Sequence, residues 1–401
     1  VVHTLFMPSK KSDYAPDEDE NEALKLAKKL SEMVKCDTTS HAGVSETEKF
    51  EQFHTVLERL FPTVHQKLER TDIDGNLLYY WKGKSSEKPI LLMSHQDVVP
   101  AEGQWKHPPF SGEIAEGKVW GRGSSDTKCS VMAFFEATER LLKEGFVPPQ
   151  DVYLASSCTE EWAGDGAPKI VNELKRRGVE LYLLCDEGGG IINQPIGGIE
   201  GNFAMVGIFE KGKADVRFTA KSNGGHASAP PKNTPIARLS AFVAETEKHS
   251  PFKKKIPPQV AAMFKALAPF APFGLKLLFG NIWLFGPVLK AVLPAQKHGL
   301  EMEVLHSNDY TEPVDINGSG YKKIEQVINE TFPGLAISPY VMTGATDAQF
   351  YQPICKNCIR FAPVIYKPEQ MEGMHGLNEN IEYDCLPGAV RFYENLIRAE
   401  K

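Results

Sequence analysis

The sequence has 401 residues, of which 42% are hydrophobic and 24% charged, and its formal net charge is −7. This length predicts two or three domains, with enough chain for more than one hydrophobic core. The acidic balance argues against nucleic acid as the main partner, because phosphate binding requires a basic surface.

Seven cysteines are scattered along the chain, which is not the pattern of a secreted disulfide framework. Cys355 and Cys358 form a Cys-x-x-Cys pair, which we interpret as packed thiols because neither a second pair nor a thioredoxin-like context accompanies it. No charged segment followed by an apolar one marks a signal peptide, so we expect a cytoplasmic protein. The sequence starts at Val1 without a methionine, which leaves a removed signal or anchor open.

The first half of the chain predicts helices that alternate with strands. After a polar stretch at 8–20, the expected elements are helices 22–34 and 47–60, strands 77–81 and 89–94, helix 130–144, strand 152–156, helix 166–177 and strand 181–185. The run 89–94 is almost continuously apolar, as in strands that are buried on both faces. The alternation predicts an α/β fold with a mixed, largely parallel sheet sandwiched by helices.

The pattern changes after Gly198. Strands 203–209 and 214–220 and a helix at 234–248 predict a smaller α+β unit inserted into the first one. The alternating pattern then returns with helix 320–331, strands 336–342 and 358–364, and helix 386–400. We therefore predict a main domain formed by 1–204 and 313–401, and an inserted domain at 205–312.

The stretch 256–295 within the inserted domain is rich in Phe, Leu and Trp and is interrupted by prolines. The prolines and lysines argue against a membrane span, which needs about 20 uninterrupted apolar residues. Three interpretations stay open: a helical pair packed on its own domain, a lid over an apolar substrate, and peripheral contact with a membrane.

Acidic and imidazole side chains follow the predicted strands. His95 and Asp97 come directly after the buried strand 89–94, and Glu160 and Glu161 follow strand 152–156. In open α/β sheets, sites form at the carboxyl ends of strands. Taken alone, His95 with Asp97 could be a structural pair and Glu160 with Glu161 a solvated turn. Two adjacent glutamates at a buried strand end would need a cation.

Three further segments extend this set. Gly121–Lys128 delivers Asp126 to the start of a helix, where it could also be an N-cap. Asp186 and Glu187 follow the apolar strand 181–185, and His375 lies in a glycine-flanked loop. Mixed imidazole and carboxylate ligands suit Zn²⁺, with Co²⁺ or Mn²⁺ as substitutes. The set exceeds the needs of one ion, so the sequence predicts a bridged pair of metal ions.

The ordered motifs resemble those of the M20 metallopeptidase family. They are H-x-D-V-V-P at 95–100, G-R-G-x-x-D-x-K at 121–128, E-E-x-x-G-x-G-A at 160–167, D-E-G-G at 186–189, G-G-H-A-S at 224–228 and H-G-x-N-E at 375–379. The D-E-G-G run and the long apolar insert are most similar to the branch that holds carboxypeptidase S and the N-fatty-acyl-amino-acid hydrolases. The resemblance implies a zinc-exopeptidase-like catalytic domain with an inserted lid or dimerisation domain.

The resemblance also implies metal ligands. Asp126 would bridge two Zn²⁺ ions, His95 and Asp186 would complete one site, and Glu161 and His375 would complete the other. Glu187 is an alternative ligand to its neighbour, but we expect Asp186 because it is the first residue after the strand.

The remaining implied roles concern the reaction. Glu160 would be the general base, Asp97 would orient the metal-ligating histidine beside it, and His226 of the small domain would stabilise the oxyanion. In dimeric members that histidine reaches the partner's active site, so the resemblance leaves a homodimer open for this chain. The loop containing Gly344, Thr346 and Asp347 would contact substrate.

One departure from the family pattern concerns the inserted domain. Family members continue with two more strands and a helix, which carry an Asn-x-Arg that helps to hold the substrate carboxylate. Here Val292–Ala295 passes almost directly to Gln296–Val304. Either residues are missing between Ala295 and Gln296 or the domain is shortened, while the expected metal ligands are unaffected.

The leading hypothesis is a zinc-dependent hydrolase of amide bonds in peptides or N-acyl amino acids, which releases a free amino acid. Its partners would be a small-molecule or short-peptide substrate, with a homodimer and membrane contact through 256–295 left open. The alternative is a non-catalytic metal-binding or interaction protein on the same scaffold. A missing ligand or base would indicate that alternative, but all the expected metal-centre positions are present.

Overall fold

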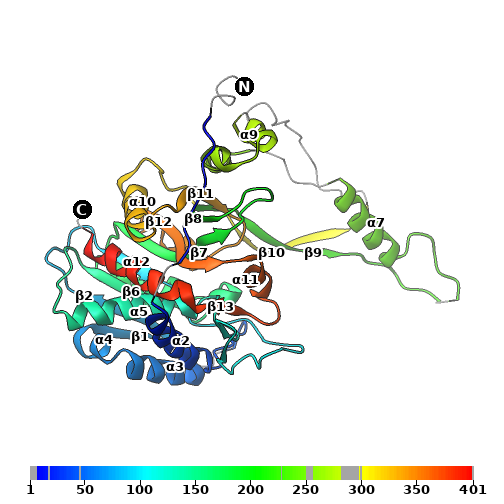
Figure 1. The fold of residues 1–401 in the computed structure, drawn as a ribbon. Coiled ribbons are helices and arrows are strands. Elements are labelled where there is room, and N and C mark those ends of the chain that lie inside the picture. Colours follow the sequence, from blue (N-terminus) through cyan, green and yellow to red (C-terminus); the bar gives the residue numbers. More distant parts are fainter. Residues whose placement is uncertain are drawn as a thin grey trace.

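The computed structural model describes residues 7–16, 19–44, 47–226, 228–249, 256–280, 298 and 300–399. A central sheet with helices on both faces forms the main body, and a small unit containing α7 projects from it (Figure 1). The strand order of this eight-stranded sheet is β1-β2-β6-β3-β7-β12-β8-β11. Its strands are β1 (Glu69–Ile73), β2 (Asn76–Trp81), β3 (Ile90–Met93), β6 (Val152–Ser156), β7 (Leu183–Asn193), β8 (Asn202–Glu210), β11 (Ala336–Met342) and β12 (Cys358–Tyr366).

The centre of the sheet is parallel and its β1–β2 edge is antiparallel. β3 pairs in parallel with β6 and β7, and β12 pairs in parallel with β7. β8 runs antiparallel to β7 and β12 and parallel to β11, whereas β2 pairs antiparallel with β1 and β6. The predicted mixed, largely parallel sheet between helices is therefore confirmed, and the parallel strands direct their carboxyl ends to one edge of the body.

Each face of the sheet supports its own hydrophobic core. Ile90 and Leu92 of β3 belong to one core, while Leu91 and Met93 belong to the other, because successive side chains of a strand point to opposite faces. All four are buried, as their continuous apolar run predicts. Burying an aliphatic side chain of this size contributes about 1.5–3 kcal/mol, so the two cores hold the sheet rigidly beneath its carboxyl edge.

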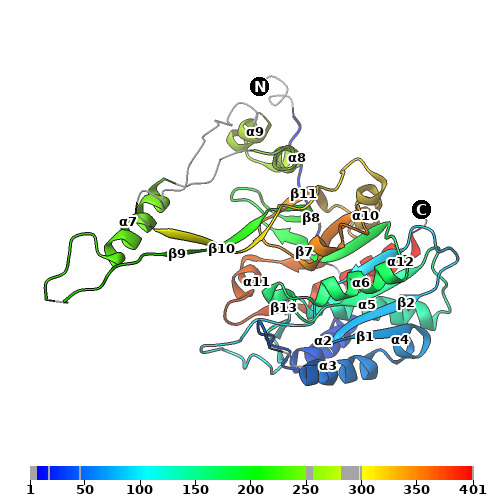
Figure 2. The same cartoon turned by 180° about the vertical axis from the view of Figure 1, so that it is seen from behind.

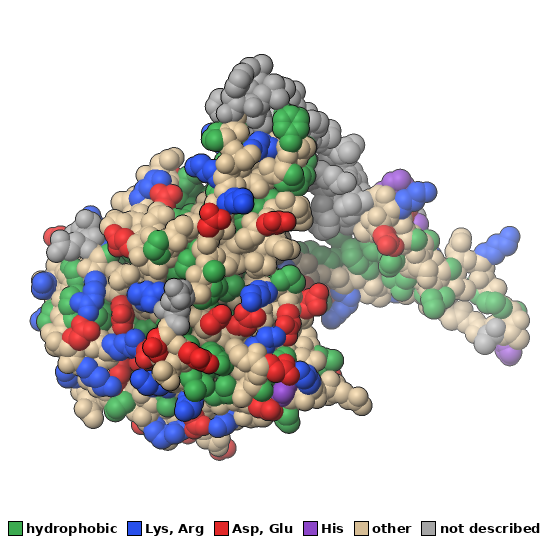
Figure 3. All heavy atoms as spheres, viewed as in Figure 1, with side chains coloured by type: hydrophobic (Ala, Val, Ile, Leu, Met, Phe, Trp, Pro, Cys, Tyr) green, Lys and Arg blue, Asp and Glu red, His purple; other side chains and the backbone are tan. Residues whose placement is uncertain are grey.

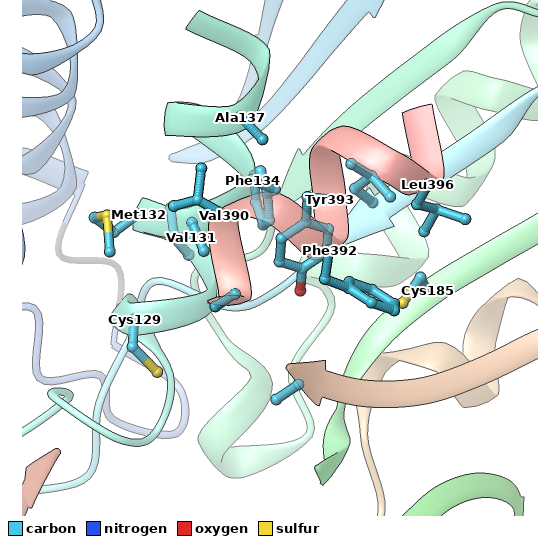
Figure 4. Close-up of a cluster of buried hydrophobic side chains, with 14 of the residues drawn as sticks. Cys129, Val131, Met132, Phe134, Ala137, Cys185, Val390, Phe392, Tyr393 and Leu396 are labelled. Atoms are coloured by element: carbon cyan, nitrogen blue, oxygen red, sulfur yellow. The ribbon is translucent and has the colours of Figure 1, made fainter. Parts of the chain in front are cut away.

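Helices cover both cores. On one face lie α2 (Glu20–Val34), α3 (Thr47–Leu60), α4 (Pro62–Lys67), α5 (Lys128–Lys143), α10 (Ser319–Thr331) and α12 (Leu386–Arg398). Figure 4 shows the contact between α5 and α12, where the Phe134 and Tyr393 rings meet edge to face with their centroids 5.8 Å apart. The other face carries α6 (Gly166–Arg176) and the 3-10 helix η5 (Asp347–Tyr351), and Figure 2 shows α6 from that side.

A second, three-stranded sheet ties together loops that are distant in sequence. Its strands are β4 (Ile114–Ala115), β5 (Lys118–Trp120) and β13 (Asn380–Glu382), in the order β13-β5-β4. The register places Asn380 opposite Trp120. This pairing brings the loop before α5 beside the loop after α11 (Pro368–Gly373), which carry Asp126 and His375 respectively.

The small unit consists, in its described part, of β9 (Lys213–Thr219), α7 (Pro235–Lys248) and β10 (Glu301–Asn308). β9 and β10 pair antiparallel, and Phe242 and Leu300 are the buried hydrophobic residues of this unit among those described. The predicted boundary at 204/205 differs from the structure, because β8 runs to Glu210 within the central sheet. A strand between β12 and β11 belongs to the main body, so the small unit begins after Glu210.

The described part of the apolar insert, residues 256–280, packs on the main body. α8 (Pro258–Leu267), the 3-10 helix η2 (Ala268–Phe270) and α9 (Phe273–Gly280) form a third core with residues of β8 and β11, including Phe203, Met205 and Tyr340. Residues 281–295 of the predicted insert lie outside the described part of the chain. Within that part, no helix is long and apolar enough to cross a membrane.

All seven cysteines are free thiols. Cys355 and Cys358 are buried at the start of β12, and the Cys358 Sγ donates a 3.4 Å hydrogen bond to the Cys355 carbonyl. This placement agrees with their interpretation as packed thiols.

Candidate metal centre

Five segments deliver acidic and imidazole side chains to the carboxyl edge of the sheet. His95 follows β3, and Glu160 and Glu161 lie on the 3-10 helix η1 (Glu160–Trp162) after β6. Glu187 lies in β7, Asp126 precedes α5 and His375 follows α11. Parallel strands end at a common edge, which is why residues so far apart in sequence meet here.

Asp126 lies between the two histidines. Its Oδ1 is 3.3 Å from His95 Nε2, and its Oδ2 is 3.0 Å from His375 Nε2. His375 Nε2 also lies 3.0 Å from Glu161 Oε2. One carboxylate that directs an oxygen to each of two imidazoles is the arrangement expected of a ligand shared by two metal ions.

Two overlapping groups of side chains are spaced to hold a cation. The donor atoms of His95, Asp126 and Glu161 lie within 4.8 Å of one another, and so do those of His95, Glu160 and Glu187. Glu161 Oε1 is buried and has no hydrogen-bond partner among the described residues. A buried, unpaired carboxylate oxygen is unfavourable unless it meets a cation, so this donor set fits divalent metal ions.

The protonation of the metal-free site shows the same need for positive charge. Burial raises the pKa of Glu160 well above its ordinary value, and it raises the pKa of Glu161 and Glu187 as well. Hydrogen bonds to Asp126 and Glu161 raise the pKa of His375 to about 10. Metal binding must therefore displace protons from His375 and from the carboxyl groups, which makes metal affinity dependent on pH.

Asp97 supports both sides of the centre from beneath. Its main-chain carbonyl lies 2.9 Å from His95 Nδ1, which orients the other ring nitrogen toward Asp126. Its carboxylate accepts hydrogen bonds from the backbone N–H groups of Glu160 and Glu161, both at 3.2 Å, and from Ser40 Oγ at 2.6 Å. The orienting role of the Asp97 carboxylate stays a prediction, with its Oδ1 3.4 Å from His95 Nδ1, and the same carboxylate holds η1.

The two acids of β7 differ from the sequence expectation. Asp186, the expected ligand, is buried, and its oxygens accept hydrogen bonds from the backbone N–H groups of Glu187 at 2.9 Å and Ala348 at 2.8 Å. Glu187 faces His95 and Glu160 within the second group. Adjacent residues of a strand point to opposite sides, and in this structure Glu187, the alternative, is the one grouped with His95 and Glu160.

Glu379, the last residue of the H-G-x-N-E motif, has a role that the motif alone does not predict. Its fully buried carboxylate accepts backbone hydrogen bonds from Gly123 at 3.1 Å, Ser125 at 2.9 Å and Asp126 at 3.0 Å. Arg122 Nη1 donates to its other oxygen at 2.7 Å. Glu379 therefore holds the loop that presents Asp126, and its place in the His375 motif was the signal for this role.

The predicted substrate loop lies at the wall of the cleft. Gly344 and Asp347 line a cavity of about 640 Å³, together with Glu160, Glu161 and His375. Thr346 is buried, and its Oγ1 donates a 2.8 Å hydrogen bond to Glu210 Oε1. The loop thus reaches the cleft through two of its three predicted residues, while the third anchors it.

Arg360 completes this anchor, a role that no local sequence pattern predicts. Its Nε donates to Glu210 Oε1 at 2.7 Å, and its Nη1 donates to the Cys358 carbonyl at 2.6 Å. Both charged side chains are at most 2% exposed. Glu210 also ends β8, where the small unit begins, so one buried ion pair connects the substrate loop with that junction.

His226 lies away from the metal cluster. It is exposed in the connection between β9 and α7, and its Nδ1 is 2.8 Å from Ser228 Oγ. It does not line the cavity that contains Glu160 and His375. Figure 1 shows this connection at the far end of the small unit, so the predicted oxyanion residue does not meet the other site residues within one chain.

A second, apolar cavity adjoins the cluster. It measures about 210 Å³ and touches Asp126 and Glu187. Its apolar lining consists of Ile192, Pro195, Met205, Tyr340, Tyr366, Met371 and Met374. The metal cluster therefore adjoins two cavities: a cleft whose wall includes charged side chains such as Lys213, Asp215 and Asp347, and a smaller cavity whose wall contains no Lys or Arg among the described residues.

Comparison with known proteins gives the family of this arrangement. A family model described as peptidase family M20/M25/M40 matches residues 91–399. The N-fatty-acyl-amino acid synthase/hydrolase PM20D1 of Xenopus tropicalis is 29% identical over 443 residues, covering 94% of this chain and 86% of the relative. The probable carboxypeptidase S-like 2 of Dictyostelium discoideum is 29% identical over 443 residues, covering 94% of this chain and 85% of that protein.

The fold is also similar to solved structures. An M20 family metallo-carboxypeptidase, Sso-CP2 of Sulfolobus solfataricus, has a TM-score of 0.69 at 16% identity, covering 95% of this chain and 99% of its own. The alignments with both relatives extend over 443 residues, more than the 401 residues of this chain, so these relatives contain residues that this chain lacks.

Proposed function

Because this chain belongs to peptidase family M20/M25/M40, we propose that it is a zinc-dependent hydrolase that cleaves amide bonds of peptides or N-acyl amino acids and releases a free amino acid. One observation carries the proposal: Asp126 directs one oxygen to His95 and the other to His375, with Glu160 alongside. The names of the two relatives, a fatty-acyl-amino acid hydrolase and a carboxypeptidase-like protein, support this substrate class.

The ligands divide around Asp126. His95, Asp126 and Glu187 would hold one ion, and Asp126, Glu161 and His375 would hold the other. Zn²⁺ suits this mixture of donors, with Co²⁺ or Mn²⁺ as substitutes. When bound, the two ions supply Lewis acidity, which polarises the scissile carbonyl and lowers the pKa of water.

Glu160 is the proton carrier. Its Oε2 is 4.0 Å from His95 Nε2, and burial with neighbouring acids raises its pKa. In this role its carboxylate takes the proton of the attacking water and delivers it to the departing amide nitrogen. Asp97 keeps Glu160 in place through the backbone N–H bond, so we regard Asp97 as a positioning residue.

Each of the two cavities binds a different part of the substrate. The acyl part occupies the apolar cavity beside Glu187, where Met371 and Met374 provide adaptable contacts. The amino-acid part occupies the larger cleft beside Gly344 and Asp347, which has charged side chains in its wall. Among the described residues that line this cleft, Lys213 is the only Lys or Arg. It therefore pairs with the substrate carboxylate.

A homodimer would give His226 its role. The side chain is exposed on the small unit and remote from the cluster of its own chain, so it stabilises the oxyanion of a second copy. Sedimentation analysis and mixed dimers of His226→Ala with Glu160→Gln test this: activity regained on mixing supports transfer between copies, and no recovery contradicts it.

The main test combines metal analysis with a hydrolysis screen. Wild-type protein binds two metal ions per chain and hydrolyses N-acyl amino acids, with kcat/KM rising from acetyl to long acyl chains. Glu160→Gln keeps both ions and loses roughly 10²–10⁴-fold in kcat, the range expected for a general base. Glu102→Gln, an exposed glutamate outside the site, is the matched control.

Three outcomes would contradict the proposal in different ways. Two bound ions without turnover on any peptide or acyl amino acid would indicate a non-catalytic metal-binding protein. Wild-type rates in Glu160→Gln would remove that residue from its role. Equal kcat/KM for acetyl and long-chain substrates would remove the apolar cavity from acyl recognition.

A further inference from the structure

Charge is distributed unevenly along this acidic chain. The chain contains 52 Asp and Glu residues among 401, yet none lies between Glu247 and Glu301. The same interval contains eight lysines. The segment that includes α8, η2 and α9 is therefore both basic and apolar, a composition that favours an anionic lipid surface.

α9 is apolar on both its inner and outer sides. Phe279 and Leu275 pack inward against the third core, whereas Phe273 is 61% exposed and Leu278 is 40% exposed. Its one charged residue, Lys276, is buried and donates a 2.9 Å hydrogen bond to Ser9 Oγ. A helix that is hydrophobic all round normally has partners all round, so its outer side lacks a covering surface among the described residues.

Exposed basic side chains lie on α8 and on the segment bound to η2, and both α8 and η2 pack against α9. Lys265 of α8 is exposed, and Lys10 and Lys11 of the N-terminal segment are exposed where that segment hydrogen-bonds to Pro269 of η2. In Figure 3, hydrophobic and basic side chains lie at the upper end of the molecule, where Figure 1 places α9. Lysines around an apolar helix face match the headgroup and acyl layers of an anionic bilayer.

The core that these helices complete extends to the apolar cavity. Ile192, Met205 and Tyr340 line the cavity beside Glu187 and also pack against the core that α8 and α9 complete. The core under α9 and the wall of the cavity thus share apolar side chains. A lipid surface at α9 would place membrane-dissolved acyl chains next to the cavity.

We propose that α8 and α9, through Phe273, Leu278 and the surrounding lysines, dock the protein on an anionic lipid bilayer, from which long-chain acyl substrates enter the cavity. The docking itself stands independently of the enzymatic activity. The delivery of substrate rests on the proposed function.

The test uses the full chain and two kinds of vesicle, phosphatidylcholine alone and phosphatidylcholine with phosphatidylserine. Wild-type protein co-sediments with the anionic vesicles, and added salt weakens this binding. The Phe273→Asp/Leu278→Asp variant binds at least about tenfold more weakly, because it loses the burial of two apolar side chains. Val147→Asp, a valine 47% exposed outside α8 and α9, binds like the wild type.

A second variant keeps the test informative if the double substitution disturbs α9. Phe273→Trp preserves an apolar side chain, and its fluorescence shifts to the blue when anionic vesicles are added. Hydrolysis of a short, water-soluble acyl amino acid stays unchanged in both variants, while hydrolysis of a vesicle-dissolved long-chain substrate falls in the double variant.

The outcomes separate docking from catalysis. Equal sedimentation with both vesicle types, or unaltered binding by the double variant, overturns the proposal. Concentration-dependent self-association that the double variant abolishes, without vesicle binding, also overturns it and assigns the face to a second copy. Vesicle binding without hydrolysis of any substrate supports the docking and contradicts the proposed function alone.

Discussion

Asp186 and Glu187 are adjacent acids with different surroundings, and we infer different roles for them. Both Asp186 oxygens accept backbone hydrogen bonds, whereas Glu187 faces the cluster. We predict that Glu187→Gln binds fewer metal ions than wild type and loses activity. Asp186→Asn keeps both ions but loses about 1–3 kcal/mol of unfolding free energy, because charged acceptors are replaced at buried donors. Elemental analysis and urea unfolding measure the two effects.

The reverse pattern would restore the sequence-based expectation. Loss of a metal ion in Asp186→Asn, with full occupancy in Glu187→Gln, would show that Asp186 turns into the cluster when metal binds. Glu102→Gln again controls for the loss of one surface charge.

The residues of the cluster were predictable from the sequence because each follows an apolar strand or a glycine turn. Choosing between Asp186 and Glu187 was not, because β7 extends to Asn193 and its faces depend on the pairing with β12. The role of Glu379 also depends on a contact across 253 positions, with the Asp126 backbone. Such non-local contacts leave no local pattern.

His54 provides a residue-scale test of pH dependence. Burial lowers its pKa to about 4, although its Nε2 lies 2.8 Å from Gln96 Oε1. As the pH falls, His54 therefore binds a proton near pH 6.5 in the unfolded chain but only near pH 4 in the native state. The stability that neutral His54 contributes is complete above pH 6.5 and is lost as the pH falls toward 4.

We predict that this linkage removes about 2 kcal/mol of unfolding free energy between pH 7 and pH 5. His54→Gln, which does not titrate, lacks this part of the pH dependence. Urea unfolding of both proteins at the two pH values measures it. Parallel pH profiles for wild type and variant would show that His54 is protonated in the native state.

At the scale of elements, the end of β8 joins the substrate loop, β12 and the small unit. Glu210 Oε1 accepts from both Thr346 and Arg360, and both charged side chains are buried. Removing one partner leaves the other charge unpaired, which typically costs 3–5 kcal/mol. We predict losses of that order in Arg360→Met and in Glu210→Met, measured by urea unfolding.

The double variant separates stability from positioning. Replacing both charges with apolar side chains recovers most of the lost stability. Thr346 still lacks its acceptor, so the loop with Asp347 stays misplaced and kcat/KM remains low while stability returns. Recovery of both quantities together would mean that the ion pair supports the fold and not the substrate loop.

Most elements with a strong local pattern were predicted within two residues. Helix 47–60, strand 152–156 and strand 336–342 coincide with α3, β6 and β11, because their periodicity ends at clear breaks. β4 has two residues and β13 has three, too few for any period to appear. The assignment of most of β8 to the small unit differs from the structure because only the pairing of β8 with β7, β11 and β12 reveals its sheet.

At the scale of the whole molecule, the metal centre connects both sheets and the helices that follow them. Its acids come from η1, β7 and the loop before α5, and its histidines follow β3 and α11. Burial raises the pKa of Glu160, Glu161 and Glu187, so without metal these groups release their protons at a higher pH in the native state than in the unfolded chain. Burial also raises the pKa of Asp186 to about 6 and that of Asp347 to about 8.

These raised pKa values determine how the stability of the metal-free protein changes with pH. Between about pH 4 and pH 8 the unfolded chain has released the protons that the metal-free native state retains, so stability falls as the pH rises. Bound metal ions allow the ligands to ionise in the native state and remove that part of the loss. Metal binding also stabilises directly, by about 2.7 kcal/mol at a free-ion concentration of 100 Kd.

We therefore predict that EDTA lowers the unfolding temperature, and that the decrease is larger at pH 8 than at pH 5. Scanning calorimetry with and without Zn²⁺ measures it. Glu160→Gln, which removes the base and spares the proposed ligands, keeps the Zn²⁺-dependent increase, whereas Glu187→Gln reduces it. An EDTA-induced decrease that is equal at both pH values would mean that the carboxyl cluster is already ionised without metal. The decrease grows with pH only if the metal-free native state retains protons that the unfolded chain has released.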